Sequence, residues 1–106
     1  NTHTHAAMTL FRGIDDDSGL SDWLDNMRRY ENKITRDDVY WGALLGEIEM
    51  IKSGTTTFND MYFYEESVLN SISATGIRSV IDIPFYFDNN GELIIDEDFI
   101  NKSKSR

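Results

Sequence analysis

Helix and strand patterns alternate through the middle of this chain, and this alternation restricts its fold more than any other feature. Thr35 and Asp38 have the spacing of a capping box, and the apolar residues after them recur at helical spacing as far as Lys52. The patterns predict, in order, a helix over 35–52, a strand over 55–63, a helix over 64–76 ending at a left-handed Gly76, and a strand over 77–87. Such alternation is expected of parallel βαβ units with right-handed crossovers, which indicates the α/β class.

The flanking segments carry weaker patterns. Residues 21–30 place apolar side chains on one side of a short helix, for which Ser21 is the expected N-cap. Beyond residue 88 we expect only a turn at 89–91, a short apolar triplet and the start of a helix at Asp96. No low-complexity linker divides the chain, so residues 1–106 are predicted to form one unit. The chain lacks an initiator methionine and starts where a strand ends, so this unit is expected to be part of a longer protein.

Composition excludes several classes of function. The formal net charge of -9 repels polyphosphate backbones, so nucleic acid is not an expected partner. The absence of cysteine excludes disulfides, thiolate zinc sites and cysteine nucleophiles. No apolar run approaches the roughly 20 residues of a membrane span, and no signal peptide is evident. We therefore expect a soluble, cytoplasmic protein that does not bind membranes.

The two histidines lie within the first five residues, in "NTHTHAAMTLFRG". In a strand, His3 and His5 point to one face and Thr4 to the other, so both imidazoles can reach one metal ion. Imidazole suits zinc, iron, nickel or cobalt, but a catalytic site takes at least three protein ligands. The pair is therefore either half of a metal site or two inert histidines at an exposed terminus, and a bare HxH motif leaves both readings open.

Other segments decide between these readings. "NTHTHAAMTLFRG", "DWL", "DDVYWGALLGEIEMIKSGTTTFNDMYFYEE" and "TGIRSV" follow one another in this order. Together they resemble the amidohydrolase superfamily, and within it the S-adenosylhomocysteine/methylthioadenosine deaminase and chlorohydrolase group. The resemblance runs from residue 1 to about residue 81, and its most specific stretch is 41–64. It implies a partial TIM (β/α)8 barrel made of the first three strands with their helices, because a whole barrel takes about 250 residues.

The resemblance also implies a metal-dependent reaction. One divalent metal ion, zinc or alternatively iron, would be bound by His3 and His5 and by later histidines and an aspartate beyond residue 106. No catalytic residue is expected within this chain itself, and the isolated piece is expected to show no turnover. The implied reaction is hydrolysis, in which a metal-bound hydroxide displaces ammonia or chloride from a nitrogen heterocycle such as an adenine nucleoside. The expected partner is this small-molecule substrate, and a homo-oligomer stays open.

Two residues are expected to contact the substrate. The resemblance places Glu31, in "ENKIT", where these deaminases hold ribose hydroxyls, and Trp23 in a segment that closes over the substrate. The alternatives are that Trp23 packs its helix on the barrel and that Glu31 is a solvated charge. Asp60, at the end of a predicted strand, is expected to cap a helix or to hydrogen-bond behind a metal ligand, with capping favoured.

The sequence departs from the family pattern at one position. The arginine of "GIR" is Arg78 in this chain. Relatives carry a second arginine five residues further on, where this chain has Ile83. Isoleucine cannot make a charge-assisted hydrogen bond, so the assignment of a substrate is weakened, whereas the assignment to the superfamily is not. Arg78 itself is expected to face solvent.

Two other functions compete with the metal-dependent hydrolase. The chain could be an autonomous acidic α/β interaction domain in which the histidines are incidental. It could also be a catalytically inactive relative that keeps part of the barrel.

Overall fold

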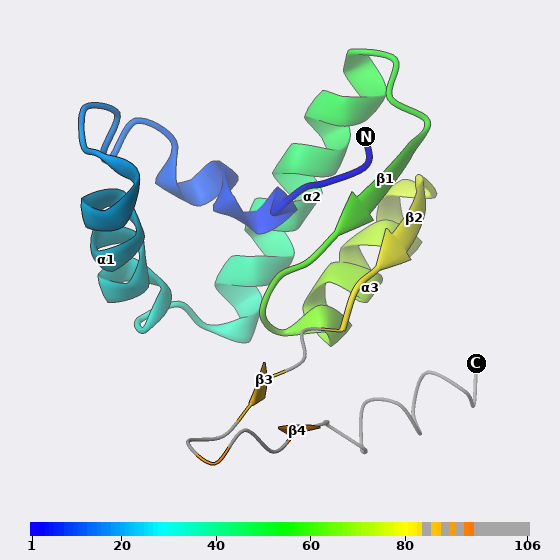
Figure 1. The fold of residues 1–106 in the computed structure, drawn as a ribbon. Helices are drawn as coiled ribbons and strands as arrows, with labels where there is room; N and C mark the ends of the chain where they lie inside the picture. The colour runs from blue at the N-terminus through cyan, green and yellow to red at the C-terminus, as the bar shows by residue number, and fades with distance from the viewer. Residues whose placement is uncertain (84–85, 88–89, 91–92, 95–106) are drawn as a thin grey trace.

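The structure is a computed structural model that describes residues 1–83, 86–87, 90 and 93–94. Its elements in chain order are the 3-10 helix η1 (Ala6–Phe11), α1 (Leu20–Glu31), α2 (Arg36–Lys52), β1 (Thr57–Asp60), α3 (Glu65–Thr75), β2 (Arg78–Ile81), β3 (Tyr86–Phe87) and β4 (Leu93–Ile94). Strands β1 and β2 pair in parallel, and α2 and α3 lie together behind them (Figure 1). The predicted α/β class is confirmed in this coarse form, as helices around a small parallel sheet.

The N-terminal segment extends this sheet on the side of β1 away from β2. The backbone amide of Thr4 donates to the Asn59 carbonyl at 2.8 Å, and the Met61 amide donates to the Thr4 carbonyl at 3.1 Å. Thr4 thereby forms a parallel bridge with Asp60. The chain beginning at Asn1 therefore runs along β1, although only the bridge at Thr4 counts as regular sheet.

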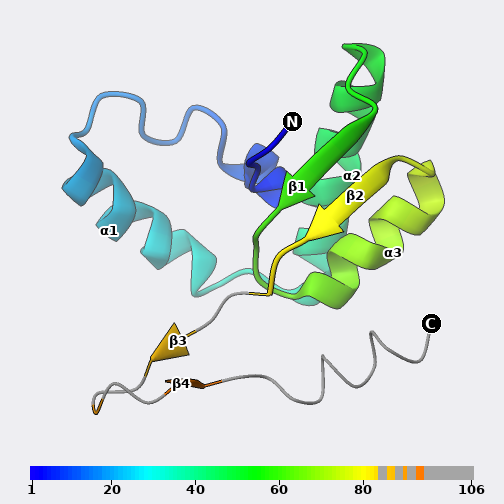
Figure 2. The same ribbon diagram turned by 45° about the vertical axis from the view of Figure 1, so that its right-hand side comes forward.

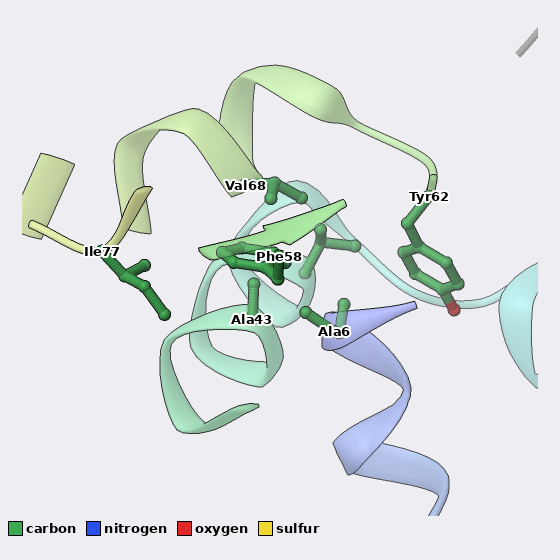
Figure 3. Close-up of a cluster of buried hydrophobic side chains, with 8 residues drawn as sticks. Ala6, Ala43, Phe58, Tyr62, Val68 and Ile77 are labelled. Atoms are coloured by element: carbon green, nitrogen blue, oxygen red, sulfur yellow. The ribbon is translucent and has the colours of Figure 1, made fainter. Parts of the chain in front are cut away.

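Phe58 of β1 lies at the centre of the core. Figure 3 shows its ring between Ala43 of α2, Ala6 of η1 and Val68 of α3, all of them buried. Residues alternate faces along a strand, so Phe58 and Asp60 share the face toward the helices while Asn59 lies on the other face. The same alternation in the N-terminal segment sets Thr4 toward the helices and both histidines on the opposite face.

Two glycines let α2 approach η1 closely. A Cβ atom on Gly42 would lie 2.6 Å from the Ala7 carbonyl oxygen, and one on Gly46 would lie 2.9 Å from the Ala6 carbonyl oxygen. The Thr9 hydroxyl donates to the Gly42 carbonyl at 2.6 Å across the same contact. No larger residue fits at either glycine without moving η1, so this pair fixes the position of the turn that follows His5.

Local signals located the helix ends well. The predicted capping box is confirmed, because the Thr35 hydroxyl accepts from the Asp38 amide at 3.2 Å and the Asp38 carboxylate accepts from the Thr35 amide at 2.8 Å. Gly76 ends α3 with a φ of 72°, in the left-handed region predicted for it.

Other boundaries were wrong. The N-cap of α1 is Gly19 and not Ser21, because the helix begins one residue before Ser21, at Leu20. The strand predicted over 55–63 is limited to Thr57–Asp60, since the chain then turns through a left-handed Tyr64, with a φ of 54°, to enter α3.

The strand predicted over 77–87 was also wrong in extent. Strand β2 ends at Ile81, and Tyr86–Phe87 pairs instead with β4 in an antiparallel ladder. The predicted turn at 89–91, apart from Asn90, and the helix predicted from Asp96 lie outside the described residues. Within the described part, no helix is both long and apolar enough for a membrane crossing.

Candidate functional site

The two imidazoles lie side by side at the end of the N-terminal segment. Their ring centroids are 4.9 Å apart, with the rings edge to face. The Nδ1 atom of His5 lies 2.6 Å from the Met61 carbonyl oxygen. Because a carbonyl only accepts, Nδ1 is the nitrogen that donates, which leaves Nε2 as the ring nitrogen that could bind a metal ion. This arrangement fits a metal ligand, since ligating histidines typically donate their second ring nitrogen to a carbonyl or carboxylate.

Asp60 binds both neighbours of His5, one through its side chain and the other through its backbone. Its Oδ1 atom accepts from the Thr4 hydroxyl at 2.9 Å and from the Ala6 amide at 2.7 Å. Since Ala6 begins η1, Asp60 binds the first amide of that helix, whereas the N-cap of the following helix α3 is Tyr64. The N-cap of η1 itself is His5, so Asp60 is the N-cap of neither helix and the expectation of capping was wrong; Asp60 instead accepts from the first amide of η1 from a distant part of the sequence.

The electrostatic environment of Asp60 is unusual. The residue is almost completely buried, and Oδ2 has no hydrogen-bond partner among the described residues. Burial raises the pKa of Asp60, while the hydrogen bonds from Ala6 and Thr4 act in the opposite direction. A carboxylate in this position stabilises a particular path of the chain between the two histidines.

A cavity of about 480 Å³ adjoins the histidine pair. It lies between α1 and the segment after β1, and α1 is set apart from the α2–α3 layer (Figure 2). Its walls bring together three of the predicted site residues, His5, Trp23 and Glu31, whereas His3 adjoins it only through its contact with His5. The other lining residues are Met8, Leu24, Met27, Arg28, Met61, Tyr62 and Phe63.

Tyr62 is a cavity residue that the sequence analysis did not single out. Its hydroxyl donates to Glu31 Oε1 at 3.1 Å. Burial, followed by the nearby charge of Glu31, raises the pKa of Tyr62. The phenol therefore stays a neutral donor and fixes the Glu31 carboxylate at the cavity wall. The only sequence signal was its position in the aromatic run "MYFY" directly after β1.

The described residues do not by themselves form a complete metal site. None of them forms a group of three or more histidine and carboxylate side chains that could hold an ion. Two imidazoles fit a transition-metal ion in type and spacing, but a catalytic metal needs further ligands.

The structure also shows the surroundings of Ile83, the position that departs from the family pattern. Ile83 follows β2 and is half-buried, so no charged group stands there. Arg78 is exposed as expected, and its Nε donates to the Thr57 hydroxyl at 3.2 Å.

A buried carboxylate outside the site was also missed. Glu47 of α2 is fully buried, with Oε1 2.5 Å from the Ser71 hydroxyl and Oε2 2.6 Å from the Thr75 hydroxyl. Burial raises the pKa of Glu47. The residue joins α2 to α3 at a distance from the cavity, so its role is structural.

An α/β scaffold with paired imidazoles on either side of the parallel bridge at Thr4 is a candidate metal site. The chain matches the amidohydrolase family over residues 1–103 and therefore belongs to that family.

Similar curated proteins carry specific names. A 5-methylthioadenosine/S-adenosylhomocysteine deaminase of Carboxydothermus hydrogenoformans is 50% identical over 96% of this chain and 25% of its own length. A 5'-deoxyadenosine deaminase of Methanocaldococcus jannaschii is 55% identical over 76% of this chain and 20% of its own length. The chain thus spans a quarter or less of the length of these relatives.

Proposed function

We propose that this chain forms the start of the catalytic barrel of a metal-dependent hydrolase that deaminates a nucleoside. The observation that carries the proposal is the shared cavity: His5 of the N-terminal segment and Trp23 and Glu31 of α1 meet around one space of about 480 Å³. This volume falls in the range of small-molecule sites. The names of the similar proteins, all adenosine-type deaminases, support this class of substrate.

The proposed architecture is the first three strands of a (β/α)8 barrel. The N-terminal segment, β1 and β2 lie in that order as parallel neighbours, with α2 and α3 on one face. In such a barrel the helices lie outside and the active site lies at the carboxyl ends of the strands. His3 and His5 stand at that end and on the face away from the helices, as a barrel site requires.

Each residue has a proposed role. His3 and His5 would hold one divalent ion, zinc or iron, whose chemistry is to supply a hydroxide at neutral pH. Met61 fixes the ring of His5 through its carbonyl. Tyr62 orients Glu31, which keeps a second carboxylate oxygen to accept hydrogen bonds from sugar hydroxyls. Trp23 presents an apolar surface to a heterocycle and excludes water from it.

The test uses the full-length protein that contains this chain. We expect it to release ammonia from 5'-deoxyadenosine, methylthioadenosine or S-adenosylhomocysteine, and to contain one equivalent of divalent metal by elemental analysis. His3→Ala and His5→Ala should each lose metal and activity. Glu31→Gln should raise KM about tenfold, the cost of one charge-assisted hydrogen bond. Glu66→Gln on α3, away from the cavity, is the matched control and should change neither the metal content nor the KM.

Other outcomes would favour the competing functions. Chloride release from a chlorotriazine without ammonia release from nucleosides would favour dechlorination. Bound metal without any turnover would favour a catalytically inactive relative. Cooperative unfolding of the isolated 106 residues, with no metal binding to the full-length protein, would favour an autonomous interaction domain.

A further inference from the structure

Helix α2 carries an apolar stripe on its outer surface, defined here as Trp41, Leu45 and Ile48. Their exposed fractions are 62%, 45% and 44%. The buried residues of α2, among them Gly42 and Ala43, lie on the opposite side, toward η1 and β1. The stripe therefore points away from the sheet.

The stripe has the spacing of a helix–helix seam. Positions 41, 45, 48 and 52 follow the alternation of four and three residues found in coiled coils. The ring of Trp41 packs edge to face on Tyr40 with centroids 5.0 Å apart. Tryptophan is a typical anchor of protein interfaces.

The charges at the two ends of α2 are complementary to those of a second copy of the helix. Arg36 pairs with Glu66, and Glu49 pairs with Arg12. The side chains of Asp37 at the start of α2 and Lys52 at its end form no hydrogen bond or ion pair with any described residue.

A second α2 helix running antiparallel brings these ends together. A two-fold axis between positions 44 and 45 sets Asp37 opposite Lys52 of the second copy and Trp41 opposite Ile48 of the second copy. Every contact is then made twice, as in an isologous dimer, and the two helix dipoles oppose each other favourably. The net charge of -9 opposes self-association in general, but the stripe itself bears no charge and its ends are complementary.

We propose that the outer stripe of α2 is a two-fold interface between two copies of this protein. It joins the copies through antiparallel α2 helices, with Asp37 of each paired to Lys52 of the other. This inference does not depend on the metal chemistry, because the stripe lies on a different surface from the histidine cavity.

Charge reversal in the full-length protein tests the interface, with dimerisation measured by sedimentation across protein concentrations. Asp37→Lys and Lys52→Glu should each raise the dimer Kd at least tenfold, because each brings like charges together twice. The double variant restores both pairs and should return the Kd to within about threefold of the wild type. Asp22→Lys and Lys33→Glu change the net charge equally outside α2 and should have no effect.

A second variant covers the case in which charge reversal disturbs folding. Leu45→Cys stands next to the proposed axis, so oxidation should link two copies through a symmetric disulfide, whereas Ser73→Cys on exposed α3 should not link them. The proposal is overturned if the full-length protein is monomeric at about 100 µM. It is equally overturned if the double variant fails to recover, the result expected when another part of the protein or a different partner covers the stripe.

Discussion

Removal of the Asp60 carboxylate tests whether the buried aspartate positions the proposed metal ligands His3 and His5. Asp60 binds Thr4 and Ala6, the neighbours of His5 on both sides, and Thr4 also lies between the two histidines. Asp60→Ala leaves the Ala6 amide without its acceptor, at a cost of about 1–3 kcal/mol. The Thr4 hydroxyl is less affected, because it also lies 2.7 Å from the Asn59 carbonyl oxygen.

These costs add to a loss of stability of about 2–4 kcal/mol when the small cavity left by alanine is included. Freedom of the chain between the histidines should also weaken metal binding. Removing a supporting partner of a metal ligand typically costs 10- to 100-fold in affinity, or about 1.4–2.8 kcal/mol. Asp60→Asn keeps an acceptor oxygen and should therefore lose less stability and less metal affinity than Asp60→Ala.

The assay measures the two quantities separately in the full-length protein. Urea unfolding of the metal-free protein gives stability, and competition with a chromogenic chelator gives zinc affinity. Val68→Ala is the control, since it removes buried core volume at α3 without touching the histidine segment. If Asp60→Ala destabilises the protein while zinc affinity stays within twofold of the wild type, as for Val68→Ala, Asp60 supports the fold alone and the reasoning fails.

Three further perturbations, the first with a matched glycine control, follow from the same structure. Gly42→Ala should destabilise the protein by about 2 kcal/mol, because the steric cost at the Ala7 carbonyl exceeds the gain of about 1 kcal/mol in helix propensity. Gly19→Ala meets no atom within 4 Å and should cost less than about 1 kcal/mol in the same urea titration. Burial raises the pKa of Glu47, so the folded protein is destabilised when this carboxyl ionises. This loss of stability is absent below the pKa of the unfolded state, and it grows as the pH rises through the pKa of the folded state. Glu47→Gln should therefore flatten the fall of Tm with rising pH above about 4.5, and an unchanged pH slope would contradict this assignment. Tyr62→Phe removes the donor to Glu31 and should raise KM about fivefold with little change in kcat, whereas an equal loss in kcat would show a role beyond orientation.

The parts of the fold that the sequence predicted are those set by neighbouring residues. Thr35 and Asp38 form their capping box within one turn, and Gly76 ends its helix through its own backbone freedom. Both signals depend on a few adjacent residues, so they survive in any tertiary setting.

The strands were predicted in kind but not in extent. A β-prone run shows where a strand can form, whereas its ends depend on which partner is available. Tyr86–Phe87 has strand character as predicted, but it pairs with Leu93–Ile94 and does not continue β2. The 3-10 helix after His5 was missed for a similar reason, because its position depends on contacts with Gly42 and Gly46 more than 30 residues away.

The candidate site shows the same division. Trp23 and Glu31 were predicted to contact the substrate because the chain resembles a known family. The structure places both residues in the wall of the cavity beside His5. Tyr62 was not found, because its role depends on a hydrogen bond across 31 residues of sequence. Asp60 carried two alternative roles that no local pattern separates.

The glycines of α2 and Asp60 act on the same short segment, the start of η1. Gly42 and Gly46 allow η1 to pack closely on α2, and Asp60 binds the first amide of η1. His5 immediately precedes that amide, so its position follows from both contacts at once. A shift of η1 caused by a larger residue on α2 must therefore also strain the bond between Ala6 and Asp60. Substitutions at Gly42 and Asp60 should then be non-additive in zinc affinity, since the first to break the arrangement leaves less for the second to lose. Strictly additive losses would mean that the helix contact and the carboxylate hold the histidine independently.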